Sequence, residues 1–181
     1  MRPPLVSTIR SGRGQAESAK LHSTAMFLKL FQLYCVRMNR LPFEEFKYIY
    51  SKVPRLTVEI VLIKDGGIVL SLRNIAPYKG FWHVPGGTVL YREKIEDAVK
   101  RIANDELDVN VELENLLGYW QVPEWLQPGG FSSPIGLVYK VKLLSGELKG
   151  NSQSSEIKIF RRLPDNMIEE QKQFLEKLTP F

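Results

Sequence analysis

The sequence predicts an α/β fold in which a mixed sheet is packed between helices. Three observations lead to this prediction. Short β-branched and apolar runs, bounded by turn residues, stand on both sides of one segment of helical period, residues 94–107. A second helical segment, residues 163–178, follows the last of these runs. Strands before and after a central helix, with another helix at the end, indicate an α/β sandwich around mixed strands.

The amino-terminal part differs in composition from the remainder. Of the 25 Lys and Arg residues, seven lie in residues 1–42 together with one of the 20 acids, Glu17, so 18 basic and 19 acidic residues remain for the rest of the chain. The net charge of +5 therefore belongs to a basic extension, and a nucleic-acid partner is not favoured. We predict a flexible extension over residues 1–37, with a short apolar helix at 25–36, and a folded domain over residues 38–181.

The folded domain is predicted to begin with a helix and a β-hairpin. Residues 43–50 form the helix. Residues 55–73, RLTVEIVLIKDGGIVLSLR, hold two strand-like runs around Asp65-Gly66-Gly67, a strong hairpin signal. Residues 81–90, FWHVPGGTVL, form a further strand interrupted by Pro85-Gly86-Gly87, where the backbone turns sharply or approaches another group closely. Later strands are predicted at residues 110–122, 134–144 and 155–160.

Composition excludes several classes of protein. No apolar run reaches the roughly 20 residues that a membrane span needs, so we expect a cytoplasmic protein without a membrane partner. Cys35 is alone and cannot form an internal disulfide. The two histidines, His22 and His83, form no zinc-like cluster. A homodimer formed through the basic extension is an open alternative.

The central helix carries a carboxylate on its apolar face. At about 100° per residue, an apolar stripe runs along the helix, and Glu106 falls inside it while Asp105 lies at its edge. An ionised glutamate on a buried stripe costs several kcal/mol unless a cation or a donor satisfies it. Glu106 therefore either pairs with an arginine or binds a cation. The stripe consists of Ile95, Ala98, Val99, Ile102 and Val109.

The spacing of charged residues in this region resembles the Nudix box, G-x5-E-x7-R-E-U-x-E-E-x-G-U, where U is aliphatic. The preceding FWHVPGG resembles the W-x-x-P-G-G approach to that box. Ile102 stands where the box has a glutamate, and Asp108 stands where it has a glycine. The resemblance covers residues 43–181 and implies an α/β/α sandwich. The matching positions are Gly87, Glu93, Arg101, Ala103, Asp105, Glu106 and Val109.

The resemblance implies a hydrolase of a nucleoside diphosphate linked to another moiety, with Mg²⁺ or Mn²⁺ as cofactor. Carried over, Glu106 is the principal metal ligand, Asp105 a second or water-mediated one, and the carbonyl of Gly86 a third. Glu93 and Arg101 form a pair that braces the loop against the helix. Because Ile102 removes a central carboxylate, one cation remains compatible with the site, since Mg²⁺ is often held by one or two carboxylates plus phosphates.

A second resemblance is to the GDP-mannose mannosyl hydrolases, whose degenerate box is similar to RIANDELDV, residues 101–109. It implies a nucleotide-sugar substrate and cleavage on the sugar-carbon side. Arg73 is then the arginine of the leaving group, and Glu59 an acidic residue at the substrate. That subfamily has a late-loop histidine base, but GNSQSSEIKIF, residues 150–160, has none.

Two further roles are left open by the sequence. Glu156 precedes the last strand and could activate water, as in the commoner Nudix ending, or be an exposed loop acid. Trp82 and Trp125 could stack on a nucleobase, although aromatics in strands more often belong to the core. His83, beside the glycine turn, is interpreted as a strand residue. The alternative function is a catalytically impaired Nudix-fold module that binds a nucleotide or a protein.

Overall fold

A computed structural model describes residues 40–150 and 154–178 of the chain. The predicted basic extension, its apolar helix at 25–36 and the boundary at residue 37 lie outside these ranges. The elements in chain order are α2 (Phe43–Tyr50), β1 (Arg55–Lys64), β2 (Gly67–Arg73), β3 (Trp82–His83), β4 (Gly86–Thr88), α3 (Ile95–Leu107), β5 (Val109–Gln121), the 3₁₀ helix η1 (Glu124–Leu126), β6 (Pro134–Gly146), β7 (Ser154–Phe160) and α4 (Glu169–Glu176).

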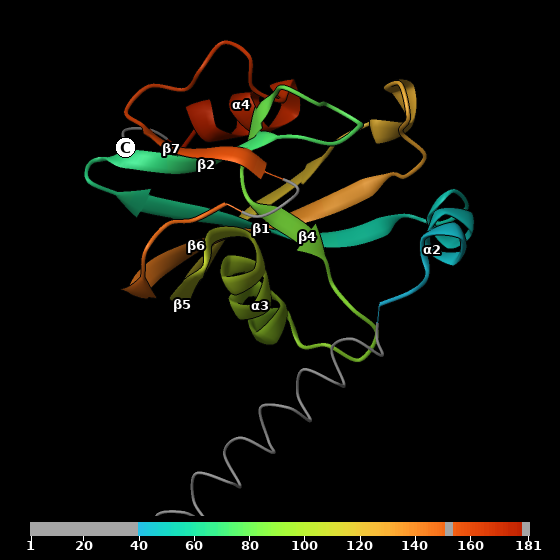
Figure 1. The fold of residues 1–181 in the computed structure, drawn as a ribbon, viewed down its shortest axis with the longest axis horizontal. Helices are drawn as coiled ribbons and strands as arrows, with labels where there is room; N and C mark the ends of the chain where they lie inside the picture. Colours follow the sequence, from blue (N-terminus) through green and yellow to red (C-terminus); the bar gives the residue numbers. More distant parts are fainter. Residues whose placement is uncertain (1–39, 151–153, 179–181) are drawn as a thin grey trace, which may run out of the picture. The chain divides into compact units, whose positions relative to one another are not determined.

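Strand β1 is the centre of a mixed sheet. It runs parallel to β6 and antiparallel to β2 and β4, and the strand order is β3-β2-β1-β6-β5, with β7 paired to β2. Two apolar clusters lie against this sheet, one containing residues of α3 and the other containing Leu175 of α4. The two helices cover opposite sides of the sheet (Figure 1). The predicted α/β/α sandwich with a mixed sheet is confirmed.

The β1–β2 hairpin forms at the predicted turn. Lys64 pairs with Gly67, and the two residues between them have left-handed backbones, with φ of 51° at Asp65 and 73° at Gly66. Positive φ at both central positions defines a type I′ turn, whose twist matches that of antiparallel strands. Asp followed by Gly tolerates these angles, which is why the short motif was a reliable signal.

The predicted strand at residues 81–90 is two short strands. β3 pairs with β2, whereas β4 pairs with β1, so the chain changes partner at Val84-Pro85. Gly86 lies opposite Glu59 and Gly87 opposite Val58. A Cβ on Gly87 would lie 3.3 Å from two side-chain carbons of Ile102, so the second glycine lets α3 pack closely on β4.

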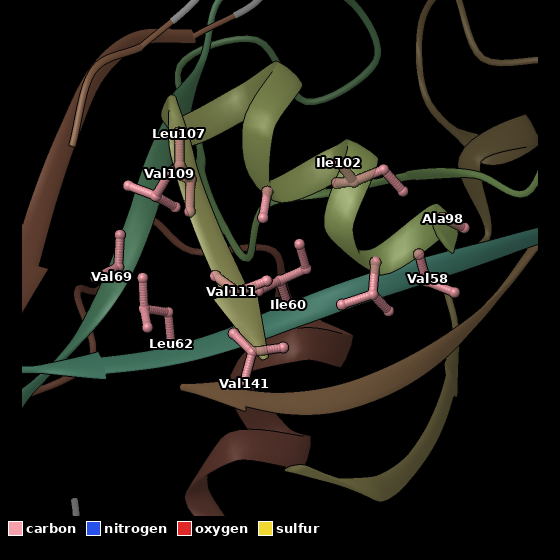
Figure 2. Packing of buried hydrophobic residues seen from close by; sticks show 12 residues of the cluster. Val58, Ile60, Leu62, Val69, Ala98, Ile102, Leu107, Val109, Val111 and Val141 are labelled. Carbon is pink, nitrogen blue, oxygen red and sulfur yellow. The ribbon is translucent and has the colours of Figure 1, made fainter. Parts of the chain in front are cut away.

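Helix α3 is held by its apolar face. Ile102 is 1% exposed and packs with Val58 and Ile60 between the helix and the sheet, as Figure 2 shows. The helix ends at Leu107 because Asp108 adopts a left-handed backbone, φ 57°, at the position where the Nudix box has glycine. Val109 was expected on the helical stripe, and this prediction is wrong, because Val109 is the first residue of β5. Its side chain is nevertheless buried in the same apolar cluster.

The last helix is shorter than the predicted 163–178. Before α4, the chain runs beside β3, where Met167 forms a bridge to Trp82 and Ile168 donates a backbone hydrogen bond to it. Asn166 accepts one from the same tryptophan. This pairing uses the backbone groups that a longer helix would have needed, so α4 begins only at Glu169.

Candidate active site

Two carboxylates from distant parts of the chain meet at one glycine. Glu106, on the last turn of α3, accepts a hydrogen bond at Oε2 from the backbone N–H of Gly86 at 3.3 Å. Glu59, on β1, packs its carboxylate against Gly86 from the paired strand, so closely that a Cβ there would overlap it. Both acids therefore converge on the Pro-Gly-Gly turn, and Gly86 is the residue that leaves them room.

Burial raises the pKa of both carboxyls. The pKa of Glu59, 8% exposed, rises to about 8 because of desolvation, although a hydrogen bond donated by Thr57 to Oε1 at 2.9 Å lowers it. The pKa of half-buried Glu106 rises to about 7 through desolvation, opposed by the Gly86 N–H and the charge of Arg73. The negative charge of Glu106 further raises the pKa of Glu59. Such a pair favours either a shared proton or a bound cation.

Arg73 lies at the end of β2 beside this pair. Its Nε donates to the carbonyl oxygen of Pro77 at 2.5 Å, and this hydrogen bond fixes the orientation of the guanidinium group. Burial lowers the pKa of Arg73, while the charges of Glu124, Glu106 and Glu59 raise it. Its positive charge in turn lowers the pKa of Glu106. The structure thus brings together three residues that the sequence singled out: Glu59, Arg73 and Glu106.

A second charged group borders the site and was missed by the sequence analysis. Glu124 of η1 accepts hydrogen bonds at Oε2 from Arg55 Nη2 at 2.9 Å and from Ser132 Oγ at 2.5 Å. The charges of Arg55 and Glu124 both act on the pKa of Glu59. Side chains alternate between the two faces of a strand, so Arg55, Thr57 and Glu59 share one face of β1. This alternation is the only sequence feature that could have placed Arg55 near Glu59. Nothing in the sequence pointed to Glu124.

Glu93 and Arg101 form a separate ion pair under the loop that leads to α3. Arg101 Nε lies 2.6 Å from Glu93 Oε1 and Nη2 lies 2.8 Å from Oε2, while Nη2 also donates to the Thr88 carbonyl at 2.9 Å. Asp105 Oδ2 lies 3.5 Å from Arg101 Nη1, and its side chain is 39% exposed. These contacts join the glutamate and arginine of the box to each other and to Asp105, whose charge also raises the pKa of Glu106.

Three other predicted site residues differ in their exposure and contacts. Trp82 is 6% exposed in the core and packs edge-on against Phe160, with ring centroids 4.7 Å apart. Glu156, on β7, forms an exposed ion pair with Lys158 at 2.8 Å, and that lysine lies over the Trp82 ring. Trp125 is 54% exposed on η1, next to Glu124, so its ring is accessible.

The donor set at Gly86 fits one divalent cation. Within residues 40–150 and 154–178, no group of three or more His, Cys, Asp or Glu side chains gathers as a metal cage would. Two carboxylates completed by water and substrate oxygens are a usual arrangement for Mg²⁺. In the same described part of the chain, no helix is long and apolar enough to cross a membrane.

A comparison with protein families shows the family to which the chain belongs. A family model described as "NUDIX domain" matches residues 53–180. The chain belongs to the NUDIX family. Among characterised relatives of this NUDIX protein, the low-salt glycan biosynthesis protein Agl8 of Haloferax volcanii is 34% identical over 125 residues, 67% of this chain and 80% of that protein. An ADP-ribose pyrophosphatase of Methanocaldococcus jannaschii is 29% identical over 143 residues, 79% of this chain and 80% of that protein.

Solved structures agree with this assignment. The NUDIX chain superposes on a MutT NUDIX hydrolase from Burkholderia pseudomallei with a TM-score of 0.63 and 28% identity, covering 70% of this chain and 99% of the other. A UDP-X diphosphatase, 20% identical, shares the fold with a TM-score of 0.59, covering 85% and 79% of the two chains. The predicted Nudix hydrolase family is therefore confirmed.

Proposed function

We propose that this NUDIX protein hydrolyses a nucleoside diphosphate linked to a sugar, with one Mg²⁺ held at Glu59 and Glu106. The observation that carries the proposal is the convergence of these two carboxylates, one buried and one half-buried, on Gly86, beside Arg73. Two acids whose pKa values rise to about 8 and about 7 are costly as neighbouring anions, and a divalent cation removes that cost.

The cation would supply charge neutralisation for a bound diphosphate, and Mn²⁺ could replace Mg²⁺ because both prefer oxygen ligands. Arg73 adds a fixed positive charge on the same side, and a planar guanidinium suits phosphate oxygens. The bond from its Nε to Pro77 orients it before substrate arrives. Arg73 would therefore stabilise the negative charge of a departing nucleoside diphosphate.

The sparse carboxylate set favours cleavage on the sugar-carbon side. Ile102, which replaces a glutamate of the box, is buried in the core, and Asp105, 39% exposed and 3.5 Å from Arg101, is proposed as a second, water-mediated ligand. A site with two carboxylates suits one cation, which is enough to neutralise a leaving group. A relative named for glycan biosynthesis also favours a nucleotide sugar. Trp125, exposed beside Glu124, is the proposed stacking surface for the base.

A nucleotide panel in ¹⁸O-labelled water tests the activity and the bond together. ADP-ribose, UDP-glucose and GDP-mannose are incubated with the purified full chain and Mg²⁺, and products are resolved by mass spectrometry. The proposal expects label in the released sugar rather than in a phosphate. Label in phosphate would overturn the sugar-carbon assignment. No release from any of the three in the presence of Mg²⁺ would favour the binding-only alternative.

The variant Glu106→Gln tests the role of Glu106 as a metal ligand. The amide keeps the size of the side chain and the acceptor for the Gly86 N–H but removes the charge, so we expect a folded protein that has lost at least a hundredfold in Mg²⁺-dependent turnover. Glu114→Gln, an exposed acid paired with Lys140 at 3.1 Å, is the control and should keep full activity. Activity retained in Glu106→Gln would refute the role of Glu106 as metal ligand.

A further inference from the structure

Arg55, the first residue of β1, is a cation near the carboxylates that the proposed chemistry has not used. Side chains that are an even number of residues apart on a strand share a face, so Arg55 and Glu59 lie on the same side of β1. The side chain of Arg55 is 17% exposed and is therefore not sealed from solvent. Its charge and its place on the Glu59 face make it a candidate for contact with an anionic substrate.

The guanidinium of Arg55 reaches toward Gly86. Its Nη1 donates to Thr88 Oγ1 at 3.3 Å, and Thr88 pairs with Thr57 across the β1–β4 ladder. Gly86, two residues earlier on β4, pairs with Glu59. At about 3.3 Å per residue, the two rows of the ladder are about 7 Å apart. The end of the Arg55 side chain is therefore one such step along the sheet from the glycine where the two carboxylates converge.

Three contacts hold this guanidinium in place before any ligand binds. One is the hydrogen bond to Thr88. Nη2 donates to Glu124 Oε2 at 2.9 Å, and the hydroxyl of Ser132 donates to the same oxygen. Phe46 of α2 covers the guanidinium, with Cζ of Arg55 5.8 Å from the ring centroid. A guanidinium that is already oriented loses less conformational freedom when it binds an anion.

The ion pair of Arg55 leaves donors unused, unlike that of Arg101. Arg101 binds Glu93 through two hydrogen bonds, at 2.6 and 2.8 Å, one to each carboxylate oxygen. Arg55 binds Glu124 through one. Its two Nη atoms carry four hydrogens and donate two hydrogen bonds within the described part of the chain, while the buried Nε has no partner there. Arg55 is thus oriented without being saturated by protein acceptors.

Arg55 and Arg73 are two cations close to the same carboxylates. Burial, and then the like charge of Arg55, lower the pKa of Arg73. The charge of Arg55 also opposes the rise that desolvation causes in the pKa of Glu59. Like charges that repel each other in a partly desolvated site favour the binding of an anion between them. A diphosphate, with negative charge on both of its phosphates, suits two guanidinium groups.

We propose that Arg55 binds a phosphate oxygen of the substrate's diphosphate, and that Glu124 is the positioning residue that holds the Arg55 guanidinium for this contact. The inference rests on the proposed function, because the diphosphate belongs to the substrate proposed above. The Nη hydrogens that Thr88 and Glu124 leave unused are the donors, and a planar fork of donors suits phosphate oxygens. Arg73 approaches the diphosphate from the end of β2, and Arg55 from the beginning of β1.

The binding of nucleoside diphosphates to Arg55→Lys tests the proposal. ADP, UDP and GDP are titrated into the full chain with Mg²⁺ by isothermal titration calorimetry, and the ligand that binds most tightly is used for the variants. Lysine keeps the charge but not the fork of donors, so we expect Kd to rise about tenfold. With a panel substrate, KM should rise while kcat changes little. Arg162→Lys, which alters an exposed arginine after β7, is the matched control and should keep the Kd of the parent.

The variant Glu124→Gln separates this role from a purely structural one. Glutamine keeps an oxygen for Arg55 but removes a negative charge beside the diphosphate, so we expect tighter binding than in the parent. If the pair only ties η1 to β1, Arg55→Lys and Glu124→Gln should both lower the melting temperature and weaken binding to the same extent. That result would overturn the proposal, as would an unchanged Kd in Arg55→Lys.

The parent protein distinguishes this inference from the proposed function. A parent that binds the diphosphate but hydrolyses no nucleotide of the panel would refute the proposed hydrolysis, and weaker binding by Arg55→Lys would still support the role of Arg55. A parent that hydrolyses a nucleotide sugar while Arg55→Lys binds and turns over like it would refute this inference alone. No binding of ADP, UDP or GDP in the presence of Mg²⁺ would refute both.

Discussion

Substitution of Glu59 by Gln should make the metal-free protein more stable at high pH. The pKa of this carboxyl rises from 4.5 to about 8 on folding, chiefly through desolvation. A carboxyl with a raised pKa binds its proton more tightly in the folded state, so folded-state stability falls as pH rises from about 4.5 through about 8. Each unit of difference between the folded-state and unfolded-state pKa corresponds to about 1.4 kcal/mol of stability. The cost of ionisable Glu59 is therefore about 3 kcal/mol at pH 7 and about 5 kcal/mol at pH 9.

The assay is urea unfolding in EDTA at pH 5, 7 and 9, followed by tryptophan fluorescence. Parent and Glu59→Gln should differ by about 1 kcal/mol or less at pH 5, and the variant should be more stable by the amounts above at pH 7 and 9. The glutamine keeps an oxygen for the hydroxyl of Thr57, so little else changes. Glu114→Gln, an exposed acid, should stay within about 1 kcal/mol of the parent at every pH.

Added Mg²⁺ should narrow the difference in stability between parent and Glu59→Gln. If Glu59 helps to hold the cation, the parent gains RT ln(1 + [Mg²⁺]/Kd) at pH 8, whereas Glu59→Gln gains less. A variant whose stability runs parallel to that of the parent at all pH values would mean that Glu59 is not buried as an ionisable group. Equal stabilisation of both proteins by Mg²⁺ would remove Glu59 from the metal site.

Three further outcomes are expected. Ile102→Glu should destabilise the protein by at least about 3 kcal/mol in urea unfolding, since Ile102 is 1% exposed and packs on Gly87; parent-like stability would mean that this position faces the site. Gly86→Ala should displace the Glu59 carboxylate, abolishing turnover while circular dichroism stays unchanged, and normal turnover would contradict the close packing at Gly86. Arg101→Ala should cost about 3 kcal/mol, because it leaves the half-buried Glu93 without its bidentate partner; a loss confined to kcat would instead give Arg101 a catalytic role.

Much of the fold could be predicted because local signals and tertiary packing agree. Asp65-Gly66 produced the expected turn, and the period of residues 94–107 produced α3 with the expected residue, Ile102, at the centre of its buried face. The end of the chain could not be predicted as well. Residues 163–168 were predicted to begin the last helix, but Pro164, Asp165 and Asn166 favour a turn, and pairing of Asn166, Met167 and Ile168 with the short strand β3 uses their backbone groups. Such a contact between distant segments leaves no periodic trace in the sequence.

Some residues of the candidate site could be predicted from the sequence and others could not. Glu106 was recognisable because a charge on an apolar stripe needs a reason, and the structure places it, half-buried, at the Gly86 amide. Glu124 was not recognisable, because its partner Arg55 lies far away in sequence and the pairing depends on how η1 folds over β1. Trp82 is an intermediate case: an aromatic in a strand suits both a core and a binding surface, and only the packing shows that its ring is buried.

The two glycines of the Pro-Gly-Gly turn accommodate different side chains, and this explains how a box that lacks one glutamate still has two carboxylates at the turn. Gly87 accommodates Ile102, so position 102 serves the core and can no longer present a carboxylate to the turn. Gly86 accommodates Glu59, which comes from the neighbouring strand and meets Glu106 there. The second acid thus reaches the turn from β1 instead of from α3. A carboxylate supplied by a strand of the central sheet is held by that sheet, and so its placement no longer depends on the helix alone.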